Sequence, residues 1–176
     1  VFKHLLLNSV PEIKNNLLPE IISGDQIGTF GIYENDKYDI NTESIKTNLT
    51  SSDAGMLLNG TKKYVMFGDS SNFIAVLAKH DAVFKFVLVK TDEEGVSVTK
   101  TPSLDQTRPL AEVSFSNVNV KNENIMIELD EELTVWKKVQ NISTAFLSLE
   151  QVGGSQACLD MSTNYAKERI QFGRPI

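Results

Sequence analysis

Apolar residues repeat at steps of three and four over residues 11–24, which predicts a helix near the start of the chain. Pro11 suits the first turn of this helix, Ser9 can cap it, and Gly24 is placed to end it. Pro19 is a candidate for a split or a kink. The helix is expected to bury one apolar side, formed by Ile13, Leu17, Leu18, Ile21 and Ile22.

From Ile27 onward the apolar residues follow the alternating or continuous patterns of β-strands. The predicted strands cover 27–34, 44–48, two arms around Asn59-Gly60, 73–78, 83–89, 96–99 and 111–120, with a polar loop at 35–41. Asn59-Gly60 between two strand-like runs predicts a type I′ hairpin. The alternation of the last strand slips between Phe115 and Val118, which indicates a bulge. About seven strands without intervening helices predict an antiparallel barrel or sandwich.

A long helix is predicted to begin near Asp130, with Glu131 and Glu132 at its positive end. Its apolar side repeats at helical spacing through Val139, Ile142, Phe146, Leu149 and Val152. Gly153 and Gly154 interrupt this side, and each mid-helix glycine costs about 1 kcal/mol relative to alanine. We therefore expect a backbone or a ligand to approach the glycines closely and offset the cost.

Residues 169–175 close the long helix with arginines, an aromatic ring, glycine and proline. Cations suit the carbonyl end of a helix, and glycine followed by proline ends one. Guanidinium groups beside an aromatic ring also fit a phosphate next to a flat heterocycle. The spacing leaves two interpretations open, a helix terminus and an anion-binding site.

Composition and charge argue against several classes of function but identify none. The chain has 176 residues, 41% of them hydrophobic, and a formal charge of −6, which argues against nucleic acid bound through a general positive field. Its longest apolar run, near 5–7, is too short for a bilayer, so no membrane partner is expected. One cysteine and two histidines predict no metal site, and they favour a reducing, cytoplasmic location. The chain begins at Val1 and stops at Ile176, which predicts a piece of a longer protein.

Four runs of the sequence carry a family resemblance. The run EQVGGSQACLDMSTNYAKERIQFGRPI resembles the first long helix of the C-terminal helical domain in acyl-CoA dehydrogenases. The runs LLPEIISGDQIGTFGIYE, LLNGTKKYV and TRPLAEVSFSNV stand upstream in the family's order. The resemblance implies an α+β protein: residues 1–25 as the end of an N-terminal helical domain, 26–128 as a β-barrel or sandwich middle domain, and 129–176 as the first long helix of the C-terminal domain.

The resemblance also implies an activity, a cofactor and partners. The family oxidises an acyl-CoA thioester to the 2,3-enoyl-CoA, while a hydride passes to FAD. Its middle domain covers one face of the flavin ring. An acyl-CoA substrate, FAD and an electron-transfer flavoprotein as acceptor are therefore expected for the complete protein.

Carried over by position, the resemblance suggests eight flavin-binding residues: Phe30, Ile32, Tyr33, Tyr64, Met66, Arg169, Gln171 and Phe172. Arg169 matches an arginine that reaches the FAD diphosphate, often on a neighbouring subunit, which implies a homo-oligomer or a hetero-oligomer of related chains. Tyr33 and Met66 stand where the family has Thr or Ser, and residues 37–39 replace a small turn. Ordinary strand packing is the alternative reading of Tyr33, Tyr64 and Met66.

Two elements that the family uses for catalysis are missing. The Asp-x-x-Arg that many members use to bind substrate reads Asn141-Ile-Ser-Thr144 here. Ser143 stands where a minority of members carry the catalytic glutamate, and Glu150 lies about two turns away, so no catalytic residue is assigned. A non-catalytic partner subunit of a hetero-oligomeric dehydrogenase is the alternative function. A β-barrel binding module without flavin is a third.

Overall fold

The computed structural model describes residues 1–35, 44–52, 55–130 and 133–176. They form two compact units, residues 1–139 and residues 140–176, and we describe each by itself. The predicted loop at 35–41, the turn at 37–39 and the acidic pair Glu131 and Glu132 lie wholly or largely outside the described residues. The domain boundaries predicted after residues 25 and 128 stay predictions.

The first unit opens with two helices, α1 (Phe2–Leu7) and α2 (Pro11–Ser23). Pro11 occupies the first turn of α2, and Gly24 ends the helix in the left-handed conformation, with φ of 85°. Both features follow the prediction. The prediction for Ser9 is wrong, because its hydroxyl donates a 2.7 Å hydrogen bond to the Leu6 carbonyl at the end of α1. Val10 takes the position before α2, without a side-chain cap.

Helix α2 continues through Pro19 without a break. Pro19 and Ile22 are exposed, Ile22 at 68%, so the prediction that Ile22 is buried is wrong. Ile13 and Leu17 are buried as expected, while Leu18 and Ile21 are partly buried against the same core. The apolar side of α2 is therefore narrower than its composition suggests.

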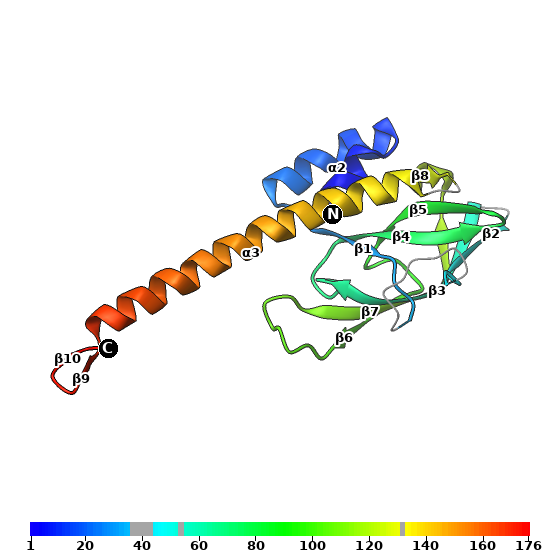
Figure 1. The fold of residues 1–176 in the computed structure, drawn as a ribbon. Helices are drawn as coiled ribbons and strands as arrows, with labels where there is room; N and C mark the ends of the chain where they lie inside the picture. Colours follow the sequence, from blue (N-terminus) through cyan, green and yellow to red (C-terminus); the bar gives the residue numbers. More distant parts are fainter. Residues whose placement is uncertain (36–43, 53–54, 131–132) are drawn as a thin grey trace. The chain divides into compact units, whose positions relative to one another are not determined.

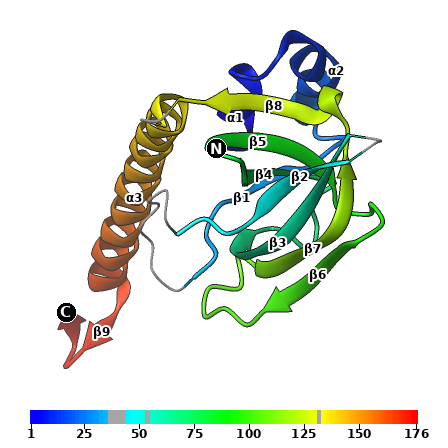
Figure 2. The same cartoon turned by 90° about the vertical axis from the view of Figure 1, so that its right-hand side faces the viewer.

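Eight strands of the described chain form one curled sheet (Figures 1 and 2). They are β1 (Gly28–Gly31), β2 (Asn48–Ser52), β3 (Gly55–Met66), β4 (Phe73–His80), β5 (Val83–Lys90), β6 (Val96–Thr101), β7 (Leu110–Val120) and β8 (Ile125–Leu129). The order is β6-β7-β3-β2-β4-β5-β8, with β1 also paired to β4. Most pairings are antiparallel, whereas β1 and β2 run parallel to β4. The predicted α+β class is confirmed, and where an antiparallel barrel or sandwich was expected the sheet is mostly antiparallel and open, with β6 and β8 at its ends.

Strand β4 lies between two hydrophobic cores. Ala75 and Leu77 face the core that includes α1, α2 and the first turn of the last helix. Ile74, Val76 and Ala78 face a second core inside the curled sheet. Burial on both faces explains why residues 73–78 read as one continuous apolar run instead of an alternating one.

The hairpin predicted at Asn59-Gly60 is wrong, because β3 runs unbroken from Gly55 to Met66. Gly60 instead marks a register shift against β7. A side chain there would place its Cβ 2.5 Å from Thr47 Oγ1, and Gly60 has a φ of 143° that L-residues rarely adopt. The bulge predicted between Phe115 and Val118 is confirmed on the β7 side of the same shift.

Several elements also differ from the prediction. The strand expected at 27–34 covers only Gly28–Gly31. The strand expected at 44–48 begins only at Asn48, and β8 was not predicted at all. A short 3-10 helix, η1 (Asn122–Asn124), precedes β8, which pairs with β5. The long helix starts at Thr134 instead of near Asp130, because the Asp130 carboxylate accepts the Thr134 N–H at 2.7 Å and stands before the first turn.

The second unit is the greater part of α3 (Thr134–Glu168) and a small hairpin of β9 (Ile170–Gln171) and β10 (Arg174–Pro175). Phe172 and Gly173 form its turn, both with positive φ, as type I′ turns require. Arg169 directly follows the last residue of α3, and its N–H still donates to the Tyr165 carbonyl at 2.9 Å, as expected for a cation at the helix end. The prediction is wrong for Arg174, which lies on β10. The glycines at 153–154 have no described atom within 4 Å of an added Cβ. Within residues 140–176, the close approach expected there is not found.

Candidate functional site

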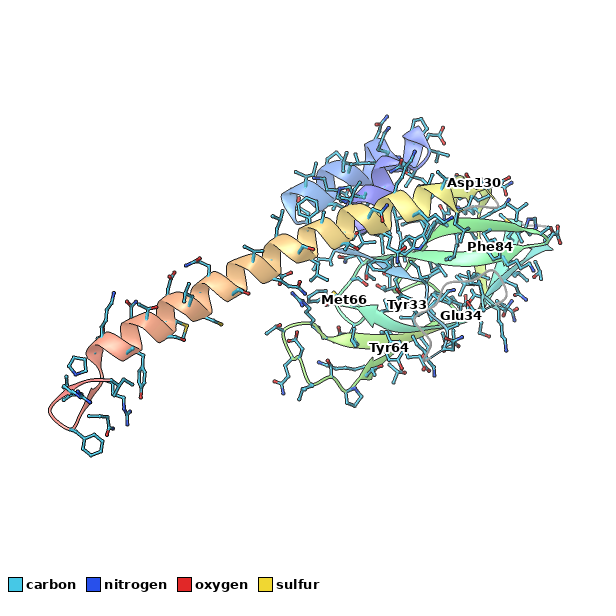
Figure 3. The ribbon with its side chains drawn as sticks, in the orientation of Figure 1. Tyr33, Glu34, Tyr64, Met66, Phe84 and Asp130 are labelled. Atoms are coloured by element: carbon cyan, nitrogen blue, oxygen red, sulfur yellow. The ribbon has the colours of Figure 1, made fainter. Side chains whose placement is uncertain are left out.

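Two hydrogen bonds join β1 and the segment that follows it to β3. The Thr29 hydroxyl donates to the Met66 carbonyl at 2.6 Å. Farther along, the Lys63 N–H donates to the Tyr33 carbonyl at 2.7 Å. Tyr33, Tyr64 and Met66 consequently come from adjoining segments of one region of the sheet (Figure 3). We call these three residues the β1–β3 wall.

Tyr64 has an unusual backbone. Its φ is 55°, in the left-handed region, and it lies inside the register shift between Lys62 and Val65. A bulky residue in this conformation costs about 1–3 kcal/mol and persists where the surrounding structure over-determines it. Bulges of this kind re-aim a side chain next to functional sites. Met66 and Phe67, the latter with φ of 56°, are 38% and 39% exposed beside it.

Phe30 and Ile32 have different surroundings from the wall. Ile32 is buried in the core that faces α1 and α2. Phe30 is half-buried, and its ring centroid lies 6.1 Å from that of Trp136 at an interplanar angle of 45°. In this unit both residues pack the sheet against helices, and neither joins the wall.

A buried ion pair that the sequence analysis missed lies beside the wall. Lys62 Nζ stands 2.6 Å from Glu34 Oε1, and the lysine side chain is completely buried. The carboxylate also accepts the backbone N–H groups of Lys46, at 2.7 Å, and Thr47, at 3.0 Å. Lysine is almost never fully buried unless paired, so nothing in the run TKKY pointed to this position.

Burial and charge set opposing demands on this pair. Burial lowers the pKa of Lys62 to about 8, although the attraction of Glu34 acts in the other direction. For Glu34, burial would raise the pKa, but Lys62 and the hydrogen bonds from residues 46–47 together hold it below its usual value. Glu34 is therefore a charged, fully engaged carboxylate at neutral pH.

The three C-terminal candidates lie in the second unit. The Arg169 guanidinium carbon is 5.5 Å from the centroid of the Tyr165 ring, a cation–π distance. Its backbone N–H donates to the Tyr165 carbonyl at 2.9 Å, and its carbonyl accepts the Ile176 N–H at 3.2 Å. Gln171 is exposed on β9, and Phe172 is 100% exposed at the tip of the hairpin.

Other kinds of site find little support in the described part of the chain. No three His, Cys, Asp or Glu residues there gather closely enough to hold a metal ion. None of its helices is long and apolar enough to cross a membrane. A cavity of about 650 Å³ lies between α2 and the sheet, lined in part by Glu12, Leu17 and Phe73. It contains none of the eight predicted flavin residues.

Residues 29–118, just over half of the chain, match the family described as acyl-CoA dehydrogenase, middle domain. The chain belongs to the acyl-CoA dehydrogenase family. The 2-methylacyl-CoA dehydrogenase, mitochondrial, of Solanum tuberosum is 31% identical over 180 residues. That match covers 98% of this chain and 43% of the relative. The chain spans less than half the length of the curated relatives it matches.

Solved acyl-CoA dehydrogenase structures share the fold. A glutaryl-CoA dehydrogenase in complex with glutaryl-CoA has a TM-score of 0.88 and 23% identity, over 98% of this chain and 45% of that one. A glutaryl-CoA dehydrogenase from Mycobacterium smegmatis, in complex with FADH2, has a TM-score of 0.82 and 23% identity, with the same coverage. Both likenesses extend past the middle domain to 98% of this chain.

Proposed function

We propose that this chain is the middle domain and the first helix of the C-terminal domain of an FAD-dependent acyl-CoA dehydrogenase. The complete protein would oxidise an acyl-CoA thioester to the 2,3-enoyl-CoA. The observation that carries the proposal is the β1–β3 wall, which lies within the residues that match the family. It combines two tyrosines with the partly exposed Met66.

The wall fits one face of a flavin ring. Tyr64 offers an aromatic side chain and Tyr33 a phenol that can donate a hydrogen bond, while Met66 offers apolar, polarizable contact without a donor. FAD, when bound, would supply the hydride acceptor. The protein's part is to orient the ring and to exclude water from it. Arg169 suits a diphosphate, since a guanidinium can donate two parallel hydrogen bonds to phosphate oxygens.

The proton acceptor for the reaction is not assigned to this chain. Glu34 is a carboxylate near the wall, but Lys62 and the N–H groups of residues 46–47 occupy its oxygens. A carboxylate engaged in this way, with a lowered pKa, is a poor base. The activity of the complete protein would therefore need a base from residues other than those described here.

The proposal includes partners. Acyl-CoA is the expected substrate and an electron-transfer flavoprotein the expected electron acceptor. Because Arg169 matches an arginine that serves a neighbouring subunit in the family, we expect a homo-oligomer or a hetero-oligomer of related chains. A cytoplasmic location remains a prediction from the sequence, and the curated relatives include proteins named as mitochondrial.

The test uses the complete protein. We expect it to purify with bound FAD and visible flavin absorption, and to lose that absorption when an acyl-CoA substrate reduces it. Tyr64→Ala should weaken FAD retention by roughly tenfold, since stacking a flat ring on an aromatic side chain contributes about 1–3 kcal/mol. Tyr64→Phe, which keeps the aromatic ring and removes only the hydroxyl, is the matched control. A complete, folded protein that binds no FAD would refute the proposal.

A second function, a non-catalytic partner subunit, is favoured by specific substitutions. Met66 cannot donate to a flavin, and the positions Asn141 and Thr144 carry neither charge of the family's Asp-x-x-Arg. Coexpression of the complete protein with a competent paralogue decides between the two. A partner subunit should raise the paralogue's activity while showing none alone, whereas a dehydrogenase should turn over substrate by itself.

A further inference from the structure

One edge of β4 pairs first with β1 and then with β2, and the change from one strand to the other lies beside the wall. β1 ends at Gly31, opposite Val76. β2 begins at Asn48, opposite Lys79. The chain leaves the edge after Gly31 and returns to it at Asn48, so Tyr33 lies just beyond the last ladder pair of β1. Its backbone must be held by other contacts.

Those contacts come from two neighbouring residues of β3. Lys62 Nζ donates to the Ile32 carbonyl at 3.2 Å. The Lys63 N–H donates to the Tyr33 carbonyl at 2.7 Å. Lys62 Nζ also pairs with the Glu34 carboxylate at 2.6 Å. Residues 62–63 therefore hold three consecutive residues, with Tyr33 in the middle.

The ion pair extends this attachment to the start of β2. Glu34 accepts the N–H groups of Lys46 and Thr47, and the Thr47 carbonyl accepts the Lys79 N–H of β4 at 2.9 Å. One carboxylate and one ammonium thus join the end of β1, the middle of β3 and the segment that enters β2. Figure 3 shows Glu34, Tyr33 and Tyr64 in this region of the sheet.

The same lysine precedes the strained residue of the wall. The register of β3 against β7 shifts directly after Lys62, and Tyr64 lies inside the shift with its positive φ. Lys62 is therefore the last residue of β3 in regular register with β7 before the shift that contains Tyr64. Buried ion pairs often add little net stability compared with apolar residues of similar volume, so the presence of this one calls for another role.

We propose that the Lys62–Glu34 ion pair is a positioning device that holds Tyr33 and Tyr64 in register against the flavin ring. This inference rests on the proposed function. Neither residue of the pair is assigned to touch the cofactor. Lys62 fixes the backbone on both sides of Tyr33, and it sets the point from which the Tyr64 bulge begins.

The experiment uses the complete, oligomeric protein, with FAD as the probe. The variants are Lys62→Met, Glu34→Gln and the double variant, in a thermodynamic cycle. The double variant replaces both charges, so it avoids the unpaired buried charge that would destabilise the single variants. The control is Lys85→Met, on strands away from the wall. It removes the ion pair in which Lys85 Nζ of β5 lies 3.2 Å from Glu128 Oε2 of β8.

We expect the double variant to unfold near the wild-type temperature and to bind FAD about tenfold more weakly, roughly the contribution of stacking one flat ring on an aromatic side chain. The visible circular dichroism of its bound flavin should also change, because that signal reports the ring's surroundings. A purely structural pair would move only the unfolding temperature. The Lys85→Met variant should keep both the affinity and the flavin spectrum.

Three results would overturn the inference. A folded double variant with wild-type FAD affinity and flavin dichroism would show that the pair does not position the wall. Failure of all three variants to fold would assign the pair to folding alone. A wild-type protein that binds no FAD would remove the proposed function itself, and the inference with it, which distinguishes that failure from the first two.

Discussion

Gly60 offers the sharpest test of the fold, because the sequence suggested a turn where the structure has close packing. In Gly60→Ala the new Cβ would lie 2.5 Å from Thr47 Oγ1 and 2.7 Å from Thr47 Cα. The nearest backbone atom cannot swing away like the end of a flexible side chain. The φ of 143° adds strain for any residue with a side chain.

The magnitude follows from these two terms. Overpacking in a buried site costs about 1–3 kcal/mol, and an unfavourable φ adds about 1–3 kcal/mol more. We expect Gly60→Ala to lower the free energy of unfolding by about 3–5 kcal/mol. Gly24→Ala is the matched control, since Gly24 has a φ of 85° but no described atom within 4 Å of an added Cβ. It should lose only the strain, about 1–2 kcal/mol.

The assay is urea denaturation followed by tryptophan fluorescence. Trp136 is the chain's single tryptophan, and it is 5% exposed in the core that joins the sheet to the helices. Its emission therefore reports unfolding of the first unit. Equal losses for the two alanine variants would show that the contact between Gly60 and Thr47 does not constrain the fold.

Three further predictions follow from other contacts. The pKa of Lys62 is lowered to about 8 in the folded protein, so the unfolded chain binds more protons between pH 8 and 10.5. The free energy of unfolding should therefore rise over that window by at most about 3 kcal/mol. Denaturation of wild type and Lys62→Met as a function of pH checks this, and an equal rise in both proteins would contradict it. Gly153→Ala should stabilise the 176-residue chain by about 1 kcal/mol in thermal unfolding, because the added Cβ would meet open space. If the same substitution destabilises only the complete protein, the close approach that the sequence suggested is present there. The 176-residue chain alone should bind FAD weakly or not at all in isothermal titration, because Arg169 is expected to serve a neighbouring subunit; tight binding would show a self-contained site.

Local patterns were sufficient for much of the fold. The continuous apolar runs at 73–78 and 83–89 predicted two adjacent strands, which pair as β4 and β5. The slip in alternation between Phe115 and Val118 predicted a bulge that the structure contains. Each signal resides in consecutive residues, whose side chains must match the faces of their own strand. The resemblance of four runs to one family then suggested the candidate residues.

Tertiary structure decided the features that depend on residues far apart in the chain. Asn59-Gly60 has the composition of a turn, but Thr47 packs against the glycine and keeps β3 extended. Lysine is usually a surface residue, but the charge of Lys62 pairs with Glu34, 28 positions earlier, and this pairing offsets the cost of burial. A sequence pattern reports the preference of a residue for its immediate neighbours. Whether a glycine is crowded or a lysine is paired depends on which distant segment the folded sheet brings beside it.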